Sequence, residues 1–186
     1  MTEELFRDDA ALLECEATVL SVDEQGVVLD RTVFYPLGGG QAGDTGVLIA
    51  ADGRTFPIAD TRKHKGVAGA IAHVPAAPAE GLVPGTRVTA RIDADRRRAH
   101  MRSHTAPHPL CALVPHPADG RAIPAGRGRV RGLEIDGGDR QPCGGTHVAN
   151  TSAVGAVVVT KVEKKSAVTR RVVLGFADGD ARSAAR

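Results

Sequence analysis

Two histidines and a cysteine–histidine pair are the residues of this chain whose types and spacing best suit chemistry. His100 and His104 lie four residues apart, so on a helix both imidazoles would project from one face and could share an ion. Cys143 and His147 bracket two glycines and a threonine, and the glycines allow a tight loop that aims both side chains at one point. Three imidazoles and one thiolate are a ligand set that suits zinc. The spacing therefore predicts a zinc ion bound by His100, His104, Cys143 and His147.

Spacing alone leaves the role of that ion open. Four protein ligands are typical of a structural zinc site, whereas catalytic zinc usually keeps one position for water. His108, Cys111 and His116 are further donors, but they lie in a proline-rich stretch. We interpret these three as surface residues.

A glycine-rich segment is the second feature with chemical potential. Gly38, Gly39 and Gly40 form a triple glycine that exposes backbone amides and permits close approach of a ligand. Gln41 follows and offers both a donor and an acceptor. The lysine and hydroxyl residue that end a P-loop are missing here. The alternative interpretation is an ordinary glycine-rich turn between strands.

Basic residues gather in three groups, although the formal net charge is only +2. Such groups attract phosphates without reading a nucleotide sequence, but they are also typical of a solvated surface. One Tyr, four Phe and no Trp argue against base stacking on aromatic side chains. The groups are Arg96, Arg97, Arg98 and Arg102; Arg121, Arg127, Arg129 and Arg131; and Lys161, Lys164, Lys165, Arg170 and Arg171.

The elements that would position these residues change in type near Asp93. Before it, short alternating segments and a turn at Asp52 and Gly53 predict a small β-barrel with a core of aliphatic side chains. The expected strands cover residues 15–22, 26–30, 46–50, 55–59, 66–74 and 86–93. We therefore expect one domain over residues 1–92 and a second over residues 93–186.

The second domain is expected to begin with a helix that carries the histidine pair. Asp93 or Asp95 can accept the free N–H groups at its start, and the prolines after residue 106 should end it. Residues 107–127 are expected to be irregular. Strands are expected at residues 128–136, 152–162 and 167–176, followed by a polar tail.

Cysteine usage and hydropathy indicate the compartment. Three cysteines are too few for a disulfide scaffold and fit a reducing environment. The acidic N-terminal segment is unlike a signal peptide, and the apolar stretches are too short to span a membrane. We expect a cytoplasmic protein without a membrane partner.

Three strings of residues, in this order along the chain, resemble a known family. They are DRTVFYPLGGGQ at residues 30–41, HMRSHTA at residues 100–106 and DRQPCGGTHVANT at residues 139–151. Weaker similarity continues through residues 155–174. The chain resembles the editing domain of alanyl-tRNA synthetase and the free-standing AlaX-type editing proteins.

The resemblance implies an α+β fold, in which a small N-terminal β-barrel precedes a two-layer α/β editing domain. It implies trans-editing, that is, hydrolysis of Ser-tRNA(Ala) or Gly-tRNA(Ala), at a Zn²⁺ ion on the same four ligands. Thr32 and Gln41 would contact the serine hydroxyl at the catalytic site. Substrate binding would fall to Gly38, Gly39, Gly40 and Arg102, and the partner would be the acceptor end of tRNA(Ala). No obligate protein partner is implied.

The chain departs from the family between His104 and Cys143, where it is several tens of residues shorter. The editing domain is therefore expected to be truncated in its middle, within residues 107–125. A catalytically impaired, zinc-stabilised tRNA-binding module is the alternative function. A structural zinc protein without an RNA role is a third.

Overall fold

The computed structural model describes residues 1–113, 131–135 and 139–177, which divide between two compact units. The first unit holds Met1–Met101 and Gly144–Thr146, and the second holds Arg102–Cys143 and His147–Arg186. Helix α1 (Ala94–Thr105) begins in the first unit and ends in the second. The predicted domain boundary at residue 93 stays a prediction. Among the described residues, no helix has the length and apolar character needed to cross a membrane.

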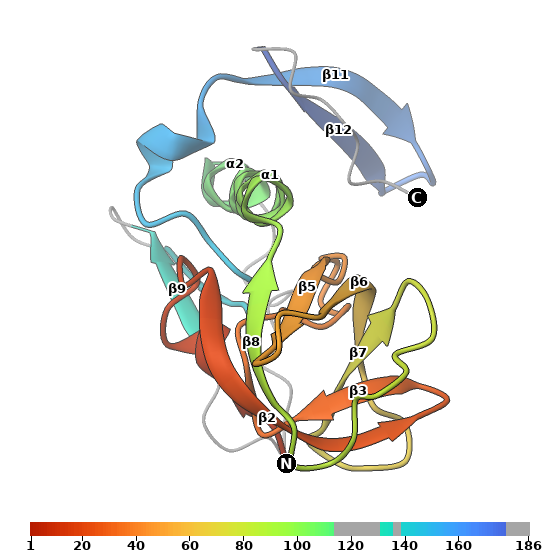
Figure 1. The fold of residues 1–186 in the computed structure, drawn as a ribbon. Coiled ribbons are helices and arrows are strands. Elements are labelled where there is room, and N and C mark those ends of the chain that lie inside the picture. Colours follow the sequence, from red (N-terminus) through yellow and green to blue (C-terminus); the bar gives the residue numbers. More distant parts are fainter. Residues whose placement is uncertain (114–130, 136–138, 178–186) are drawn as a thin grey trace. The chain divides into compact units, whose positions relative to one another are not determined.

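A closed barrel forms the body of the first unit (Figure 1). Neighbouring strands follow the order β2-β3-β7-β6-β5-β8, and β8 pairs with β2 to close the ring. The predicted small β-barrel is therefore confirmed. Its strands are β2 (Glu14–Asp23), β3 (Gly26–Leu29), β5 (Gly46–Ala50), β6 (Thr55–Lys63), β7 (Ile71–Pro75) and β8 (Arg87–Ile92).

Aliphatic side chains fill the barrel, as the scarcity of aromatic residues predicted. Strand β6 shows the underlying pattern, because Phe56 and Ile58 are buried while the residues between and beside them are exposed. Each large apolar side chain buried in this way stabilises the fold by about 1.5–3 kcal/mol. The buried cluster also includes Val19, Val27, Leu29, Val33, Phe34, Leu48, Val88, Ala90 and Ile92.

Three short elements accompany the barrel in the first unit. Strand β1 (Glu3–Glu4) pairs in parallel with β4 (Arg31–Thr32), and the 3-10 helix η1 (Leu5–Arg7) follows β1. Phe6 of η1 is buried against the ring of Tyr35, with ring centroids 5.3 Å apart. This contact holds the N-terminal segment beside the start of the glycine-rich loop.

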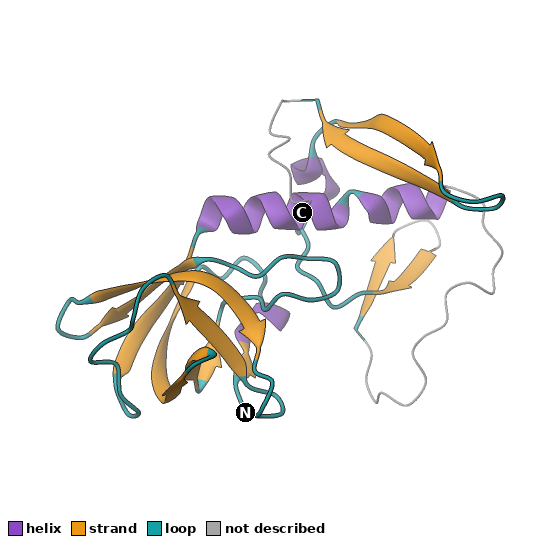
Figure 2. Cartoon of the chain, turned by 90° about the vertical axis from the view of Figure 1, so that its right-hand side faces the viewer, coloured by secondary structure: helices purple, strands orange, loops and turns teal. Residues whose placement is uncertain are grey.

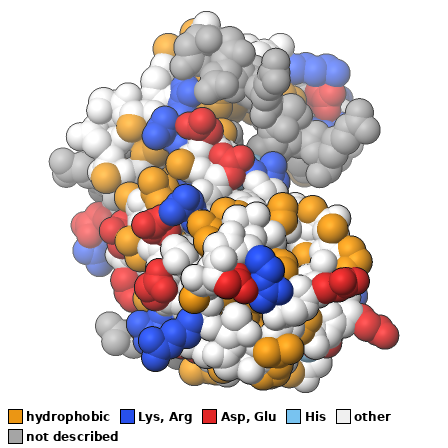
Figure 3. Space-filling model, viewed as in Figure 1, with side chains coloured by type: hydrophobic (Ala, Val, Ile, Leu, Met, Phe, Trp, Pro, Cys, Tyr) orange, Lys and Arg blue, Asp and Glu red, His pale blue; other side chains and the backbone are white. Residues whose placement is uncertain are grey.

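Charges of both signs are interspersed on the visible face of the barrel (Figure 3). Several exposed arginines have an acidic partner on the same or a neighbouring strand. Arg91 of β8 lies 2.7 Å from Glu14 of β2, and Arg62 lies 2.7 Å from Asp60 within β6. The barrel arginines that are paired in this way are locally neutralised.

The second unit contains one short helix, two hairpins and a 3-10 helix among its described residues (Figure 2). Strands β9 (Gly132–Ile135) and β10 (Asp139–Pro142) pair antiparallel, as do β11 (Val157–Lys164) and β12 (Arg170–Phe176). Helix α2 (Pro107–Leu113) follows α1, and η3 (Thr151–Val154) precedes β11. The fold is α+β, while the predicted two-layer arrangement stays a prediction.

Helix α2 corrects the expectation that residues 107–127 are irregular. Pro107 and Pro109 fall in its first turn, where backbone N–H groups have no acceptor within the helix. Proline therefore costs no hydrogen bond at these positions, and the chain resumes a helix one residue after α1 ends. The rest of that segment, together with the predicted tail and Arg121, Arg127 and Arg129, lies outside the described residues.

Candidate metal centre

Helix α1 carries the predicted histidine pair, one turn apart. Its start is capped by Asp93, whose Oδ1 accepts the backbone N–H groups of Asp95 (3.1 Å) and Arg96 (3.0 Å). The acidic cap predicted for this helix is confirmed. His100 belongs to the first unit and His104 to the second.

Four side chains of the second unit converge on one point: His104, His108, Cys143 and His147. Their ligand atoms all lie within 4.8 Å of one another. Cys143 Sγ is 3.0 Å from His104 Nε2 and 3.3 Å from His147 Nε2. The helix pair α1–α2 contributes two of the donors, and the loop after β10 contributes the other two.

Two of these rings are held by a hydrogen bond on the nitrogen that points away from the cluster. His108 Nδ1 contacts Gln141 Oε1, and Gln141 Nε2 donates to the backbone carbonyl of His108 at 3.1 Å. His147 Nδ1 lies 3.2 Å from Thr105 Oγ1. Such outer contacts fix the orientation of metal-binding histidines in known sites.

The protonation states of His104 and His147 suit a cation. Burial, with His104, His108 and Arg131 nearby, lowers the pKa of His147 to about 4. Burial and the neighbouring His108 also lower the pKa of His104. Both rings are therefore neutral near pH 7, which is the form that ligates metals.

The donor set and its spacing fit zinc. One thiolate and three imidazoles are ligands that zinc accepts in a tetrahedral arrangement. Bond lengths of about 2.0–2.3 Å place the donors of such a tetrahedron roughly 3.5 Å apart. The separations of 3.0 and 3.3 Å from Cys143 Sγ to the two imidazole nitrogens are close to that value.

The structure thus brings together three of the four predicted ligands and adds His108. His104, Cys143 and His147 lie in the cluster, whereas His100 is not among the grouped residues. His100 is 6% exposed, and its Nε2 has no hydrogen-bond partner among the described residues. The interpretation of His108 as a surface residue is wrong, because α2 continues the helical path and places this ring one turn after His104. The spacing His104–His108, equal to that of His100–His104, was the available signal.

The triple glycine forms a tight turn in the first unit. Gly38 and Gln41 exchange two backbone hydrogen bonds of 3.0 Å, and the φ angles of Gly39 and Gly40 are +60° and +80°. Two positive φ angles in succession are the geometry of a type I′ turn, which side chains other than Gly, Asn and Asp rarely adopt. The role of these glycines in substrate binding stays a prediction.

Gln41 binds Thr146, the residue that precedes His147 in the sequence. Gln41 Nε2 donates to Thr146 Oγ1 at 2.9 Å, and Thr146 N–H donates to Gln41 Oε1 at 3.0 Å. Both side chains are buried, at 3% and 0% exposure. The side-chain amide of Gln41 therefore stabilises the first unit by binding Thr146.

Replacing Gln41 by alanine is expected to lower the free energy of unfolding by about 1–3 kcal/mol, because the buried N–H of Thr146 would lose its acceptor. Urea titration followed by circular dichroism measures the change. Thr146→Val is the matched variant, since it removes the hydroxyl but keeps the N–H bond to Gln41, and its loss should be smaller. Equal stability of Gln41→Ala and the parent chain would contradict this assignment.

Thr32 is fully buried, and its hydroxyl already has two partners. Its Oγ1 lies 2.7 Å from His73 Nε2 and accepts the N–H of Phe34 at 3.0 Å. His73 Nδ1 faces the carbonyl of Val27 at 2.9 Å, so this nitrogen carries the ring proton and Nε2 accepts from Thr32. Burial lowers the pKa of His73 to about 4, so the ring stays neutral. For Thr32 to contact a substrate hydroxyl, its own hydroxyl would have to give up its hydrogen bond with His73 or with the N–H of Phe34.

Arg102 was predicted to bind substrate, and in the structure its guanidinium contacts η3 and β12 of the second unit. Its Nε and Nη2 both donate to the carbonyl of Val154, at 3.1 and 3.0 Å. Its guanidinium also lies over the ring of Phe176, 4.4 Å from the centroid. These contacts join α1 to the end of η3 and to β12.

A buried ion pair anchors α1 within the first unit. Arg97 and Asp44 are each 1% exposed, and Arg97 donates to both oxygens of the Asp44 carboxylate. Arg97 also donates to the carbonyls of Ala10 (2.7 Å) and Val33. The same carboxylate accepts the N–H of Tyr35 at 2.7 Å, so one pair ties the helix to the glycine-rich loop.

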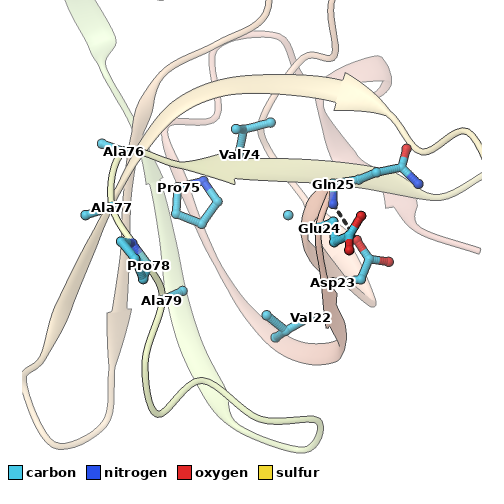
Figure 4. Close-up of a pocket in the computed structure, with 11 residues that line it drawn as sticks. Val22, Asp23, Glu24, Gln25, Val74, Pro75, Ala76, Ala77, Pro78 and Ala79 are labelled. Carbon is cyan, nitrogen blue, oxygen red and sulfur yellow. Dashed lines mark hydrogen bonds between the residues drawn. The ribbon is translucent and has the colours of Figure 1, made fainter.

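Two hollows lie away from the cluster atoms. One, of about 490 Å³ in the second unit, is lined by α1–α2 residues and by β12, including Leu110, Arg170 and Phe176. The other, of about 380 Å³ in the barrel, lies between the β2–β3 turn and the segment after β7 (Figure 4). Asp23 stabilises the β2–β3 turn, because its Oδ1 accepts the backbone N–H of Gln25 at 2.8 Å. Asp23 Oδ2 also lies 2.8 Å from His64 Nε2, and this contact lowers the pKa of Asp23.

Comparison with known proteins identifies the family. The chain is 30% identical to the alanyl-tRNA editing protein AlaX-M of Methanosarcina barkeri, with 96% of this chain and all of that relative covered. The chain belongs to the AlaX-M family of alanyl-tRNA editing proteins. A second AlaX-M protein, from Methanosarcina acetivorans, is also 30% identical over its full length.

Further matches link this AlaX-M family member to class II synthetases. Residues 6–96 match the family described as tRNA synthetases class II (A). Residues 130–173 match the threonyl and alanyl tRNA synthetase second additional domain. The chain is also 50% identical to the alanine–tRNA ligase of Methanothrix thermoacetophila over 58% of its length, but it spans only 11% of that relative.

Proposed function

We propose that this chain hydrolyses the ester bond of tRNA(Ala) mischarged with serine or glycine, at a zinc centre that includes His104, Cys143 and His147. The observation that carries the proposal is the convergence of these side chains in one cluster with His108, in a chain whose relatives are named alanyl-tRNA editing proteins. The fourth ligand is His100, as the spacing predicts, or His108. The tRNA-charging activity of the longer ligases is not proposed for this chain.

In the reaction, water attacks the carbonyl carbon of the aminoacyl ester. The bond between that carbon and the ribose oxygen breaks, the oxygen takes up a proton, and free amino acid and tRNA are released. A zinc ion bound there would activate the attacking water or orient the amino acid and the terminal ribose. His104, Cys143 and His147 would hold the ion, and Gln41 fixes Thr146, the residue that precedes His147 in the sequence.

Selection of serine over alanine requires a group that recognises the additional hydroxyl. A site that hydrogen-bonds this hydroxyl is left with an unpaired polar group when alanine binds, which penalises the cognate amino acid. Thr32 and Gln41 are our candidates for the contact. Both already bind buried partners, so the serine hydroxyl would have to join or replace one of these hydrogen bonds.

We further propose that the tRNA acceptor end is held by its phosphates. The β11–β12 hairpin carries exposed basic side chains, among them Lys164, Arg170 and Arg171. Gly38, Gly39, Gly40 and Arg102 are our candidates for contacts nearer the aminoacyl end. The reaction is expected in the cytoplasm, where charged tRNA is used.

A catalytically impaired tRNA-binding module is the second candidate, and one observation favours it. The alignment with the Methanosarcina barkeri relative runs over 246 positions, although this chain has 186 residues. Part of that relative therefore has no counterpart here, and we propose that the missing part lies between His104 and Cys143. A metal site depends on the shell that supports it, so this loss bears on turnover.

Deacylation by the purified chain tests the proposal. We expect hydrolysis of Ser-tRNA(Ala) and Gly-tRNA(Ala), little hydrolysis of Ala-tRNA(Ala), loss of activity after metal chelation, and recovery with zinc. Release of radiolabelled amino acid measures each rate. Zinc retention and tRNA binding without hydrolysis would favour the impaired module instead.

A further inference from the structure

The β11–β12 hairpin of the second unit (Figure 1) exposes several apolar side chains to solvent. All of β11 except Glu163 is exposed. Monomeric soluble proteins rarely leave a contiguous apolar surface uncovered, and such a surface marks an interaction site where it occurs. The exposed valines of the two strands are Val157, Val158, Val159, Val162 and Val172.

Strand register gathers most of these side chains on one face of the hairpin. Side chains at alternate positions of a strand share a face, as do residues directly opposite each other on paired strands. Val172 of β12 lies opposite Val162 of β11, and Leu174 lies opposite Val159. The apolar strip defined in this way consists of Val157, Val159, Val162, Val172, Leu174 and Phe176.

The two halves of the apolar strip differ in exposure. On β12, Phe176 lies under the guanidinium of Arg102, and Leu174 lines the hollow beside α1 and α2. On β11, Val159 and Val162 are exposed, and Val162 is the more exposed of the two at 59%. The described part of the chain therefore leaves the β11 half of the strip open to solvent.

Strand β11 also has an unpaired edge. Within the described ranges it pairs with β12 alone, in a two-stranded sheet. The outward N–H and C=O groups of such an edge can pair with the backbone of a further strand. A partner that added a strand to β11 would satisfy these groups and cover exposed valines at the same time.

The charges on β11 favour a second copy of the same strand as that partner. Lysines on an edge strand usually prevent pairing, because like charges repel each other. In β11, however, Glu163 follows two residues after Lys161. If two β11 strands pair antiparallel about a two-fold axis at Val162, each Lys161 lies opposite Glu163 of the partner subunit. The strand is therefore complementary to itself in charge, with a valine pair at the centre.

The geometry of β11 permits this pairing. Its register shift lies between Val159 and Lys161, whereas Lys161–Lys164 pair with β12 without interruption. The stretch that holds the facing charges is therefore regular. Within one chain, Glu163 lies 2.6 Å from the ammonium of Lys161 and 2.8 Å from that of Lys165. Association exchanges the first contact for an equivalent one and leaves no charge without a partner.

We propose that two copies of this chain associate through their β11 strands, antiparallel and centred on Val162, to form a four-stranded sheet. The two apolar strips become continuous across the two-fold axis, and each Val162 is covered by its counterpart. Because the same surface is used on both copies, the interface closes at a dimer. The proposal depends neither on metal binding nor on deacylation.

Sedimentation velocity of the full chain over about 1–100 μM tests the association. We expect the mass to rise from that of one chain to that of two. Val162→Lys places two ammonium groups opposite each other on the axis, so it should raise the dissociation constant of the dimer by more than about 10-fold. Val67→Lys is the matched control, because Val67 is also exposed, at 50%, and lies in the barrel unit. It should sediment like the parent chain.

Charge exchange tests the register. Lys161→Glu alone and Glu163→Lys alone should each weaken the dimer by about 10-fold, because like charges then face each other at two symmetric positions. The double exchange should restore association. An equimolar mixture of the two single variants should form a mixed dimer, since both of its facing pairs carry opposite charges. Circular dichroism checks that each variant keeps its fold.

A parent chain that stays monomeric over the whole concentration range would overturn the proposal. A dimer that Val162→Lys leaves unchanged would place the interface elsewhere and overturn it too. Failure of the double exchange to restore association would refute the register centred on Val162. A monomeric chain that hydrolyses Ser-tRNA(Ala) refutes the dimer alone, and an inactive dimer refutes the hydrolytic function alone.

Discussion

Replacing Cys143 by serine is expected to abolish metal retention and to slow deacylation of Ser-tRNA(Ala) by more than about 100-fold. Cys143 Sγ is the donor around which the cluster is arranged, with His104 Nε2 at 3.0 Å and His147 Nε2 at 3.3 Å from it. A serine hydroxyl is a poor zinc ligand that stays protonated near pH 7. Zinc content per chain and the initial rate of amino-acid release measure the two effects.

Cys111→Ser is the matched control for that experiment. Cys111 lies on α2 in the same unit and is exposed, outside the four-donor group. It should keep both the metal and the proposed activity. An active, metal-replete Cys143→Ser chain would remove the thiolate from the proposed centre, and with it the reason to place the chemistry there.

Removing the buried guanidinium of Arg97 is expected to have the largest effect on stability. Arg97→Met should lower the free energy of unfolding by about 3–5 kcal/mol, because the Asp44 carboxylate would remain buried without its counter-ion. The carbonyls of Ala10 and Val33 would also lose a donor. Urea denaturation followed by circular dichroism measures the loss.

Arg91→Met is a suitable comparison, since Arg91 forms an exposed pair with Glu14 on the barrel surface. Exposed ion pairs contribute little, so this variant should stay close to the parent chain. The double variant Arg97→Met, Asp44→Asn should be less costly than the sum of its parts, because removing both charges leaves neither one unpaired. Similar losses for Arg97→Met and Arg91→Met would show that the buried pair is not a specific anchor.

Most of the barrel could be predicted from local patterns. The Asp52–Gly53 turn, the alternation along β2 and the turn after Asp23 each depend on neighbouring residues, and the structure shows the hairpins there. Strand β6 runs to Lys63, beyond the predicted end at residue 59, because pairing with β7 shifts register between Ile58 and Asp60 and then continues. That extension depends on a partner strand, which periodicity within one segment does not report.

The helix after the barrel was harder to predict in its second part. Prolines are breakers inside a helix, but Pro107 and Pro109 occupy a first turn, where they cost nothing. The distinction depends on where one helix ends and the next begins. Composition alone does not contain that boundary.

The residue types and intervals of His100, His104, Cys143 and His147 predicted a zinc-type ligand set, three members of which lie in the cluster, and the surrounding strings predicted a relation to the AlaX-type editing proteins. Tertiary structure decided which further imidazole joins them, because His108 reaches the cluster only through the course of α2 and the contact with Gln141. It also decided the surroundings of Gln41 and Thr32, which lie buried against Thr146 and His73. Sequence spacing determines which side chains share a local face, whereas contacts between residues more than 30 positions apart arise only when the chain packs.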